Sequence, residues 1–220
     1  MTGYHFTLAG ANLVALGSGS LFWPEKKLLC VSDLHLGKSD RVMRWGGPLL
    51  PPYEVRETLY RLEADIVLSD AQTVICLGDS FDDLASEASL RLDELSWLTR
   101  LQAGRRWIWI EGNHDPGPLS IGGTHLQSLP IQPLIFRHLP IAAASGEVAG
   151  HYHPKVQMSL RGRHFSKPCF LVDGDRLILP AFGTYTGGQK TQSLELKDLM
   201  RPEALAIITG KEARPIPMPR

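Results

Sequence analysis

The chain has 220 residues, of which 43% are hydrophobic and 21% are charged. This length suits one well-buried domain over residues 1–220 and is short for two, and the composition excludes a disordered or fibrous protein. Lys and Arg together number 23, as do Asp and Glu, so the formal net charge is zero. Any affinity for nucleic acid must therefore come from a local basic patch, because the chain has no overall positive field.

Three features predict a cytoplasmic protein without a membrane segment. No stretch approaches the roughly 18 consecutive apolar residues of a membrane span. The N-terminus lacks a basic segment, and the glycines and serines at 17–20 interrupt its only apolar run, which argues against a signal peptide. Cys30, Cys76 and Cys169 are odd in number and lack metal-type spacing. They predict buried free thiols in a reducing compartment.

The first half of the chain has the pattern of an α/β sheet. Residues 5–23 predict short strands with a Gly/Ser turn, typical of a hairpin at a sheet edge. Apolar runs then predict buried strands at 27–32, 73–78, 106–111 and 134–137. Between the first three of these, apolar residues at helical spacing predict helices over 54–68 and 86–102, the second with Ser86 as its N-cap. This alternation indicates a largely parallel sheet.

The second half of the chain is richer in strands. Runs at 156–160, 169–173, 175–180 and 204–209 predict short strands separated by turns. We therefore expect a second, more antiparallel sheet that packs on the first and forms a two-sheet α/β sandwich. The last ten residues, 211–220, contain three prolines and predict a flexible tail.

Polar residues that can bind metals follow the predicted core strands directly. They are Asp33 and His35, then Asp79 and Asp82, then Asn113, His114 and Asp115, then His138, and finally His151 and His153. In open α/β sheets, ligands bind beyond the carboxyl ends of the strands, so we expect these side chains to converge there. Alternation along an extended chain would direct Asp33 and His35 to one side, and likewise His151 and His153, so that each pair could hold a metal together.

The donor types narrow the choice of metal. Carboxylate, amide and imidazole donors without thiolates suit Mn, Fe or Zn better than Mg or Ca. A lone Asp after a strand is usually a helix cap or turn residue, and a lone His is usually a hydrogen-bonded polar residue. Five motifs in order, each after an apolar strand, favour a metal site over that alternative. Gly78, Gly112 and Gly150 agree, because backbone close to an ion favours residues without side chains.

The order D-x-H, G-D-x-x-D, G-N-H-D, H and G-H-x-H over residues 28–153 resembles the calcineurin-like metallophosphoesterases. Further segments resemble, within that superfamily, the ligase-associated DNA damage response endonuclease group, often called PdeM. These segments are 33–38, 49–51, 167–170, 179–183 and 186–188. The resemblance implies the two-sheet α/β sandwich of that superfamily, with the metal site at the carboxyl ends of the strands.

The resemblance also implies a role for each residue of the motifs. Asp33, His35 and His153 would hold one divalent metal, Asn113, His138 and His151 would hold a second, and Asp79 would bridge the two. Mn²⁺ is the expected ion for this mixed donor set. His114 would act as general acid, oriented by Asp115, and Asp82 would support an imidazole ligand. His125 is the alternative to His138, but it does not follow an apolar strand, which favours His138.

Phosphoester hydrolysis is the expected reaction, but the motifs leave the substrate open. The resemblance implies a DNA nuclease, acting on single-stranded or flapped DNA in repair, with a DNA ligase and a helicase as functional partners. Lys38, Arg41 and Arg44, together with Trp45, would bind the DNA strand. A second basic segment contains Arg161, Arg163, His164 and Lys167. The alternative is that these residues are ordinary solvated loop charges.

Other functions compete with the nuclease. A nucleotide or other small-molecule phosphodiesterase or phosphatase would use the same metal site. A protein Ser/Thr phosphatase is disfavoured, because Asp83 and Asp115 stand where that branch of the superfamily would have Arg and Glu. A binding scaffold with a decayed metal site is disfavoured, because all the expected ligands are present.

Overall fold

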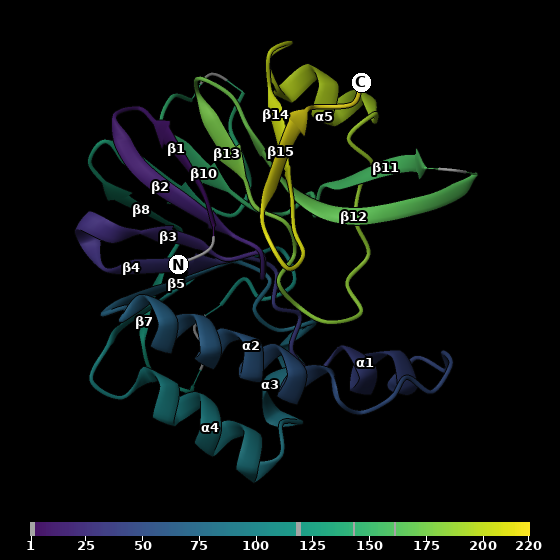
Figure 1. Cartoon of the computed structure of the whole chain (residues 1–220). Coiled ribbons are helices and arrows are strands. Elements are labelled where there is room, and N and C mark those ends of the chain that lie inside the picture. The colour runs from purple at the N-terminus through teal and green to yellow at the C-terminus, as the bar shows by residue number, and fades with distance from the viewer. Residues whose placement is uncertain (1–2, 118–119, 143, 161) are drawn as a thin grey trace.

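Two β-sheets pack face to face, and helices cover their outer faces, in the computed structural model of the protein (Figure 1). The structure describes residues 3–220 apart from 118–119, 143 and 161. This two-sheet α/β sandwich is the fold expected from the sequence. No helix among the described residues is both long enough and apolar enough to cross a bilayer.

The first sheet contains seven strands, ordered as they follow one another in the chain. They are β1 (Gly3–Leu8), β2 (Ala11–Leu16), β3 (Leu21–Trp23), β4 (Leu28–Val31), β5 (Thr73–Leu77), β6 (Arg106–Ile110) and β7 (Thr124–Leu126). Strands β1 to β4 are antiparallel, which confirms the hairpin predicted at the sheet edge. Strands β4 to β7 are parallel, so the carboxyl ends of β4, β5 and β6 lie at one edge.

The second sheet has the strand order β15-β14-β12-β13-β10-β9-β8, with β11 paired to β12. Its strands are β8 (Ser128–Ile131), β9 (Leu134–Arg137), β10 (Glu147–Ala149), β11 (Lys155–Leu160), β12 (Arg163–Val172), β13 (Arg176–Ile178), β14 (Leu205–Ile208) and β15 (Arg214–Pro217). Only β9, β10 and β13 pair in parallel among the described strands of this sheet, which confirms a second, more antiparallel sheet. The predicted strand 134–137 is β9, so it belongs to this sheet.

The helices are α1 (Lys38–Arg44), α2 (Glu54–Ser69), α3 (Leu84–Ala88), α4 (Leu92–Gln102) and α5 (Leu194–Leu199), with a 3₁₀ turn η1 (Pro24–Lys26). Helices α2 and α4 cover the outer face of the first sheet, α5 packs on the second, and α1 extends to one side (Figure 1). Side chains alternate along β5, so Ile75 and Leu77 pack between the sheets while Val74 and Cys76 pack beneath α2 and α4. Burying one such side chain contributes about 1.5–3 kcal/mol. All three cysteines are buried free thiols, as expected.

The helix predicted over 86–102 is interrupted. The structure has two helices, α3 and α4, separated at 89–91. Ser86 is not the N-cap, because the carboxylate of Asp83 accepts the Ser86 backbone N–H at 2.8 Å. Glu94 then accepts the Arg91 backbone N–H at 3.1 Å and so begins α4. Asp83 caps α3, and the capping box of Arg91 and Glu94 begins α4, so two helices form where the apolar stripe predicts one.

The prediction of a flexible tail at 211–220 is also wrong. Strand β15 pairs with β14 over four residues, and Met218 is buried under the outer face of the second sheet. The guanidinium of Arg220 donates to the carbonyls of Lys197 and Met200. Prolines are compatible with strands at a sheet edge, where one side of the backbone needs no partner, and β15 is an edge strand.

Candidate metal centre

Five strand ends meet at one edge of the sandwich. Asp33, Asp79 and Asn113 follow the parallel strands β4, β5 and β6, while His138 and His151 follow β9 and β10 of the other sheet. Backbone hydrogen bonds tie these ends together. The Asp33 N–H donates to the Gly78 carbonyl at 3.2 Å, and the Gly150 N–H donates to the His138 carbonyl at 3.0 Å. The convergence expected from strand order therefore occurs across both sheets.

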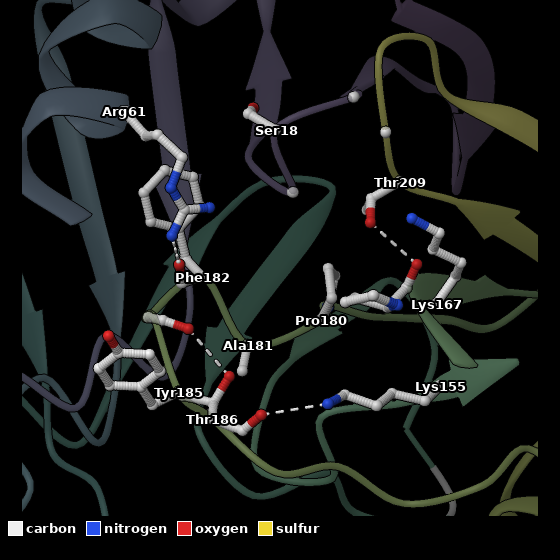
Figure 2. Close-up of a pocket in the computed structure, with 15 residues that line it drawn as sticks. Ser18, Arg61, Lys155, Lys167, Pro180, Ala181, Phe182, Tyr185, Thr186 and Thr209 are labelled. Atoms are coloured by element: carbon white, nitrogen blue, oxygen red, sulfur yellow. Dashed lines mark hydrogen bonds between the residues drawn. The ribbon is translucent and has the colours of Figure 1, made fainter. Parts of the chain in front are cut away.

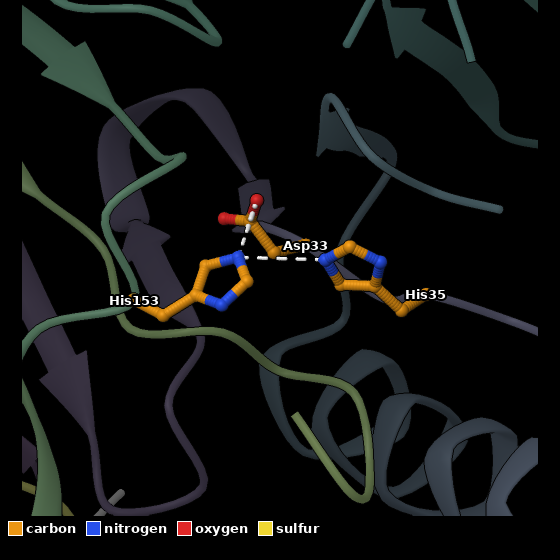
Figure 3. A group of neighbouring side chains, drawn as sticks. All are labelled: Asp33, His35 and His153. Carbon is orange, nitrogen blue, oxygen red and sulfur yellow. Dashed lines mark hydrogen bonds and ion pairs between the residues drawn. The ribbon is translucent and has the colours of Figure 1, made fainter. Parts of the chain in front are cut away.

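The first ligand group contains Asp33, His35 and His153 (Figure 3). The Nε2 atom of His153 lies 2.9 Å from Oδ1 of Asp33 and 3.4 Å from Nε2 of His35. Asp33 and His35 are buried, and His153 is half-buried. Two imidazole nitrogens and a carboxylate oxygen thus face one small volume, which fits a divalent transition metal.

The second ligand group contains Asp79, His138 and His151, with Asn113 beside it. Oδ1 of Asn113 lies 3.0 Å from Nε2 of His138 and 2.9 Å from Nδ1 of His151. Nε2 of His138 lies 3.3 Å from Oδ2 of Asp79. This set of one carboxylate, one amide oxygen and two imidazoles fits a second divalent ion.

The two groups adjoin at Asp33 and His138. Oδ1 of Asp33 lies 3.9 Å from Nδ1 of His138. Asp79 stands in the second group, and its Oδ1 accepts the His114 backbone N–H at 2.8 Å. Its main-chain carbonyl accepts the His35 N–H at 2.9 Å, whereas its carboxylate lies against His138 of the second group, so its bridging role between two metals stays a prediction.

Hydrogen bonds orient two of the imidazoles for metal binding. Nδ1 of His35 lies 2.7 Å from Oδ1 of Asp82, and Nδ1 of His138 lies 3.0 Å from the Leu77 carbonyl. An acceptor on Nδ1 holds the proton there, so Nε2 presents its lone pair to the ligand cluster. This is the arrangement of a metal-binding histidine, and it places Asp82 behind His35 and outside the first ligand group.

The electrostatics of the centre favour a cation. Burial by itself would raise the pKa of Asp79, but the hydrogen bond and charge of His138 outweigh it and lower the pKa to about 2. Burial opposes ionisation of Asp33 and Asp82 as well, yet neighbouring histidines and, at Asp82, Lys38 and Arg41 hold both pKa values below the usual range. Three carboxylates are thus ionised near neutral pH.

The pKa values of two imidazoles shift in opposite directions. Burial would lower the pKa of His138, but Asp79 and Asp33 raise it to about 9. The same negative field favours a cation at this point, and a metal ion would displace the proton that Nε2 of His138 otherwise holds. Burial and the neighbouring charge of His138 lower the pKa of His151, which leaves that imidazole neutral and able to ligate.

Several predicted ligands have unusual backbone conformations. Asp33, His35, Asp79, His151 and His153 all have positive φ, between 45° and 72°. Such conformations cost free energy in residues other than glycine and cluster at functional sites. The chain is therefore not extended here, and the expectation that His151 and His153 share one metal by alternation is wrong, since they fall into different ligand groups.

Glycines allow the strand ends to approach this closely. A Cβ on Gly112 would collide with the backbone nitrogen and Oδ1 of Asp79. A Cβ on Gly150 would collide with Oγ of Ser32, and one on Gly78 with the ring of His138. Ser32 was not predicted from the sequence, but its buried hydroxyl donates to Oδ2 of Asp33. Its position just before the first ligand is the only signal that could have identified it.

Asp115 does not orient His114, so that prediction is wrong. The Asp115 carboxylate is buried and accepts backbone N–H groups of Asp79, Ser80, Phe81 and Gly112 at 2.7–3.2 Å. Burial raises its pKa to about 6, and the nearby Asp79 charge adds to the rise. An aspartate beside a strand end readily binds backbone N–H groups, and here this preference decides where Asp115 points.

A main-chain carbonyl orients His114 instead. Nδ1 of His114 lies 2.9 Å from the Asp82 carbonyl oxygen, and its ring packs edge-on against His35 with 5.1 Å between centroids. His114 also shares a cluster with His35 and Asp82. His125, the alternative ligand, lies in β7 opposite Trp109 and in none of the described ligand groups.

The three predicted substrate-binding residues lie on a helix and not in a loop. Lys38 and Arg41 of α1 contact the Asp82 carboxylate at 3.2 and 3.0 Å. Arg44 differs, because it pairs with Asp40 at 2.8 Å and with Asp83 at 2.9 Å. Its charge is thus already neutralised. In the second basic segment, Arg161 lies outside the described residues.

Sequence and structure comparisons place this geometry among known proteins. The model of the calcineurin-like phosphoesterase family matches residues 26–192. The chain belongs to this family. It is therefore a hydrolase of phosphoester bonds in a family that uses divalent metals, and the two ligand groups are candidate sites for them.

Two solved structures are similar to this phosphoesterase. The crystal structure of the Pseudomonas putida nuclease MPE shares 26% identity, with a TM-score of 0.74, over 97% of this chain and 100% of that one. Yfce, a phosphoesterase from E. coli, shares 15% identity with a TM-score of 0.39, over 87% of this chain and 99% of that one. No curated protein sequence matches the chain significantly.

Proposed function

We propose that the phosphoesterase is a nuclease that hydrolyses phosphodiester bonds of single-stranded or flapped DNA with two divalent ions. The observation that carries this proposal is the pair of adjoining ligand groups, bordered directly by the basic helix α1. The similarity to a nuclease along nearly the whole chain supports the same assignment. Asp33, His35 and His153 would hold one ion, and Asn113, His138 and His151 the other, with Asp79 between them.

The chemistry divides between the ions and the protein. When bound, two divalent ions polarise the phosphate and lower the pKa of a water molecule to near neutral. Mn²⁺ suits the donors better than Mg²⁺, because imidazoles make up more than half of the donor set. In its doubly protonated form, His114 would donate the Nε2 proton to the leaving oxygen, since its Nδ1–H donates to the Asp82 carbonyl and Nε2 is left to face the substrate.

Helix α1 offers a surface for DNA beside this centre. Trp45, which ends the helix, is 77% exposed, and the Arg41 guanidinium lies 5.7 Å from the centre of its ring. An exposed indole next to cations suits a stacked base and its phosphate. Lys38 and Arg41 serve this surface, whereas Arg44 supports the helix through its two carboxylates. We place the enzyme in DNA repair in the cytoplasm, with a DNA ligase and a helicase as functional partners.

One comparison of substrates tests the proposal. Protein loaded with Mn²⁺ is incubated with a circular single-stranded DNA and, in parallel, with cyclic nucleotides and phosphopeptides. We expect linearisation of the circle and weak turnover of the other substrates. Turnover of cyclic nucleotides with an intact circle would contradict the nuclease and favour a small-molecule phosphodiesterase.

A further inference from the structure

Figure 2 shows a cavity of about 450 Å³ whose lining contains none of the ligands but includes Phe182 and Gly183, which are hydrogen-bonded to the main chain of Ser32 and Asp33. Its walls come from the loop 17–19, helix α2, strands β11 and β12, the segment 180–186 and the turn at 209–210. We call it the basic cavity, because Arg61, Lys155 and Lys167 line it and no carboxylate of the described residues does. The protein as a whole carries no net charge, so this local excess of three cations is notable.

These three cations form no salt bridge within the part of the chain that the structure describes, although Glu57 and Asp65 act on Arg61 at longer range. None of them has a carboxylate within salt-bridge distance there, although most other arginines of the described residues do. The Lys155 ammonium donates to the Thr186 carbonyl, at 3.1 Å. Arg61 donates to the Phe182 carbonyl and stacks on the Phe182 ring at 4.6 Å, while its buried Nε has no hydrogen-bond partner among the described residues.

The basic cavity is attached to the metal centre through its main chain. The Phe182 N–H donates to the Ser32 carbonyl at 2.8 Å, and the Gly183 N–H donates to the Asp33 carbonyl at 3.1 Å. Lys155 follows His153 by two residues. The wall of the cavity is thus hydrogen-bonded to one ligand of the first group and lies next to another in sequence. Helix α1 reaches the same group through Asp82 and His35.

We propose that the basic cavity binds a backbone phosphate of the DNA strand outside the bond that is cleaved. Cations without a carboxylate within salt-bridge distance attract phosphate, and lysine binds it as a point charge. Tyr185, at the cavity wall, is 40% exposed and has a φ of 62°, an unfavourable conformation for a bulky residue. Such strain at a site edge suits a ring held in place for a base to stack on.

With α1, the cavity would hold the strand on two sides of the first ligand group. This inference rests on the proposed nuclease function and adds a second contact region to it. It also explains why the enzyme would prefer a polymer over a small phosphodiester. A small ester contacts only the metals, whereas a longer strand also contacts the cavity.

The test removes the two lysines together. In Lys155→Gln/Lys167→Gln, we expect hydrolysis of bis-nitrophenyl phosphate to change by less than about twofold, because this ester is too small to reach the cavity. The preference in kcat/KM for an oligothymidylate over the dinucleotide should fall about tenfold. Binding of the oligomer to metal-free protein should show a shallower salt dependence, by about 0.7 in logarithmic slope for each phosphate that the variant no longer binds.

A matched control removes the same charge elsewhere. Lys26→Gln/Arg106→Gln changes two exposed cations at the opposite ends of β4 and β6 from the metal centre, and it should leave the preference for the oligomer intact. Thermal melting shows whether each variant folds. If the double variant folds poorly, Lys167→Gln alone suffices, because Lys167 is exposed and its side chain makes no hydrogen bond among the described residues.

The outcomes separate the two proposals. Suppose that the wild-type protein cleaves the oligomer. An unchanged preference for the oligomer in the cavity variant, or an equal loss of that preference in the control, then contradicts the role of the cavity but not the nuclease activity. Wild-type hydrolysis of bis-nitrophenyl phosphate without binding or cleavage of the oligomer overturns the nuclease and the cavity with it. If inorganic phosphate binds the wild-type protein and not the cavity variant, while both bind the oligomer with equal affinity, the cavity takes a free anion. This result would overturn the inference.

Discussion

The two ligand groups are supported by different parts of the protein. In the first group, His35 is held by the carboxylate of Asp82, which also contacts Lys38 and Arg41 on the exposed helix α1. In the second group, His138 is held by the carbonyl of Leu77, within the buried strand β5. One group is therefore connected to the surface that would receive DNA, and the other to the core. Substitutions near α1 should weaken the binding of one ion, whereas substitution of Asp79 should weaken the binding of both.

The largest expected effect comes from Asp79→Ala. If Asp79 bridges both ions, the variant should lose both together and should not hydrolyse DNA or bis-nitrophenyl phosphate. Elemental analysis of the purified variant measures the metal content. Asn113→Ala is the comparison and should weaken mainly the second ion. Two tightly bound ions in Asp79→Ala would show that the groups do not depend on this carboxylate.

His114→Ala should have the next largest effect, and only on difficult leaving groups. A general acid contributes about 10²–10⁴-fold, so DNA cleavage should fall by that factor. A nitrophenolate leaves without a proton, so hydrolysis of bis-nitrophenyl phosphate should change little, and the metal content should stay the same. Equal losses on both substrates, together with a missing ion, would move His114 into the metal-binding set.

Asp82→Asn tests the difference between the groups directly. The variant weakens the hydrogen bond that orients His35, and loss of such support typically costs about 10–100-fold in metal affinity. Titration of metal-free protein should show one weakened ion and one unchanged. Asp83→Asn is the matched control, because the neighbouring carboxylate binds Arg44 and caps α3 without touching His35. Equal weakening of both ions, or the same result in the control, would remove the distinction.

Met218→Ala should affect stability and not the metals. Met218 packs beneath the second sheet, far in sequence from either ligand group, and truncating a buried methionine costs about 2 kcal/mol or more. The melting temperature should fall by about 4–8 °C, with the metal content and kcat unchanged. An unchanged melting temperature would mean that the C-terminal strand does not contribute to the fold.

The strands and the ligands could be predicted from the sequence because both follow local rules. The apolar runs before Asp33, Asp79 and Asn113 are recognisable without knowledge of the fold, and strand order alone brings their ends together. How the ligands divide into groups was harder to predict. The alternation rule assumes extended chain, and it fails here because both pairs have positive φ: Asp33 and His35 share a group, whereas His151 and His153 do not.

Other wrong predictions share a cause, which is competition for backbone groups. Asp115 binds four backbone N–H groups and so does not reach its neighbour His114. Strand β15 forms despite its prolines because β14 offers an unpaired edge. Such partners come from distant parts of the chain, and no local pattern shows them.

The positions of the bound ions would decide whether the two ligand groups form one two-ion centre. Crystals of the protein grown with Mn²⁺ and measured by anomalous diffraction at the manganese edge would locate them. We expect two peaks in each chain, one among Asp33, His35 and His153 and the other among Asn113, His138 and His151, with Asp79 in contact with both. A single peak, or a second peak away from these residues, would contradict the two-ion centre.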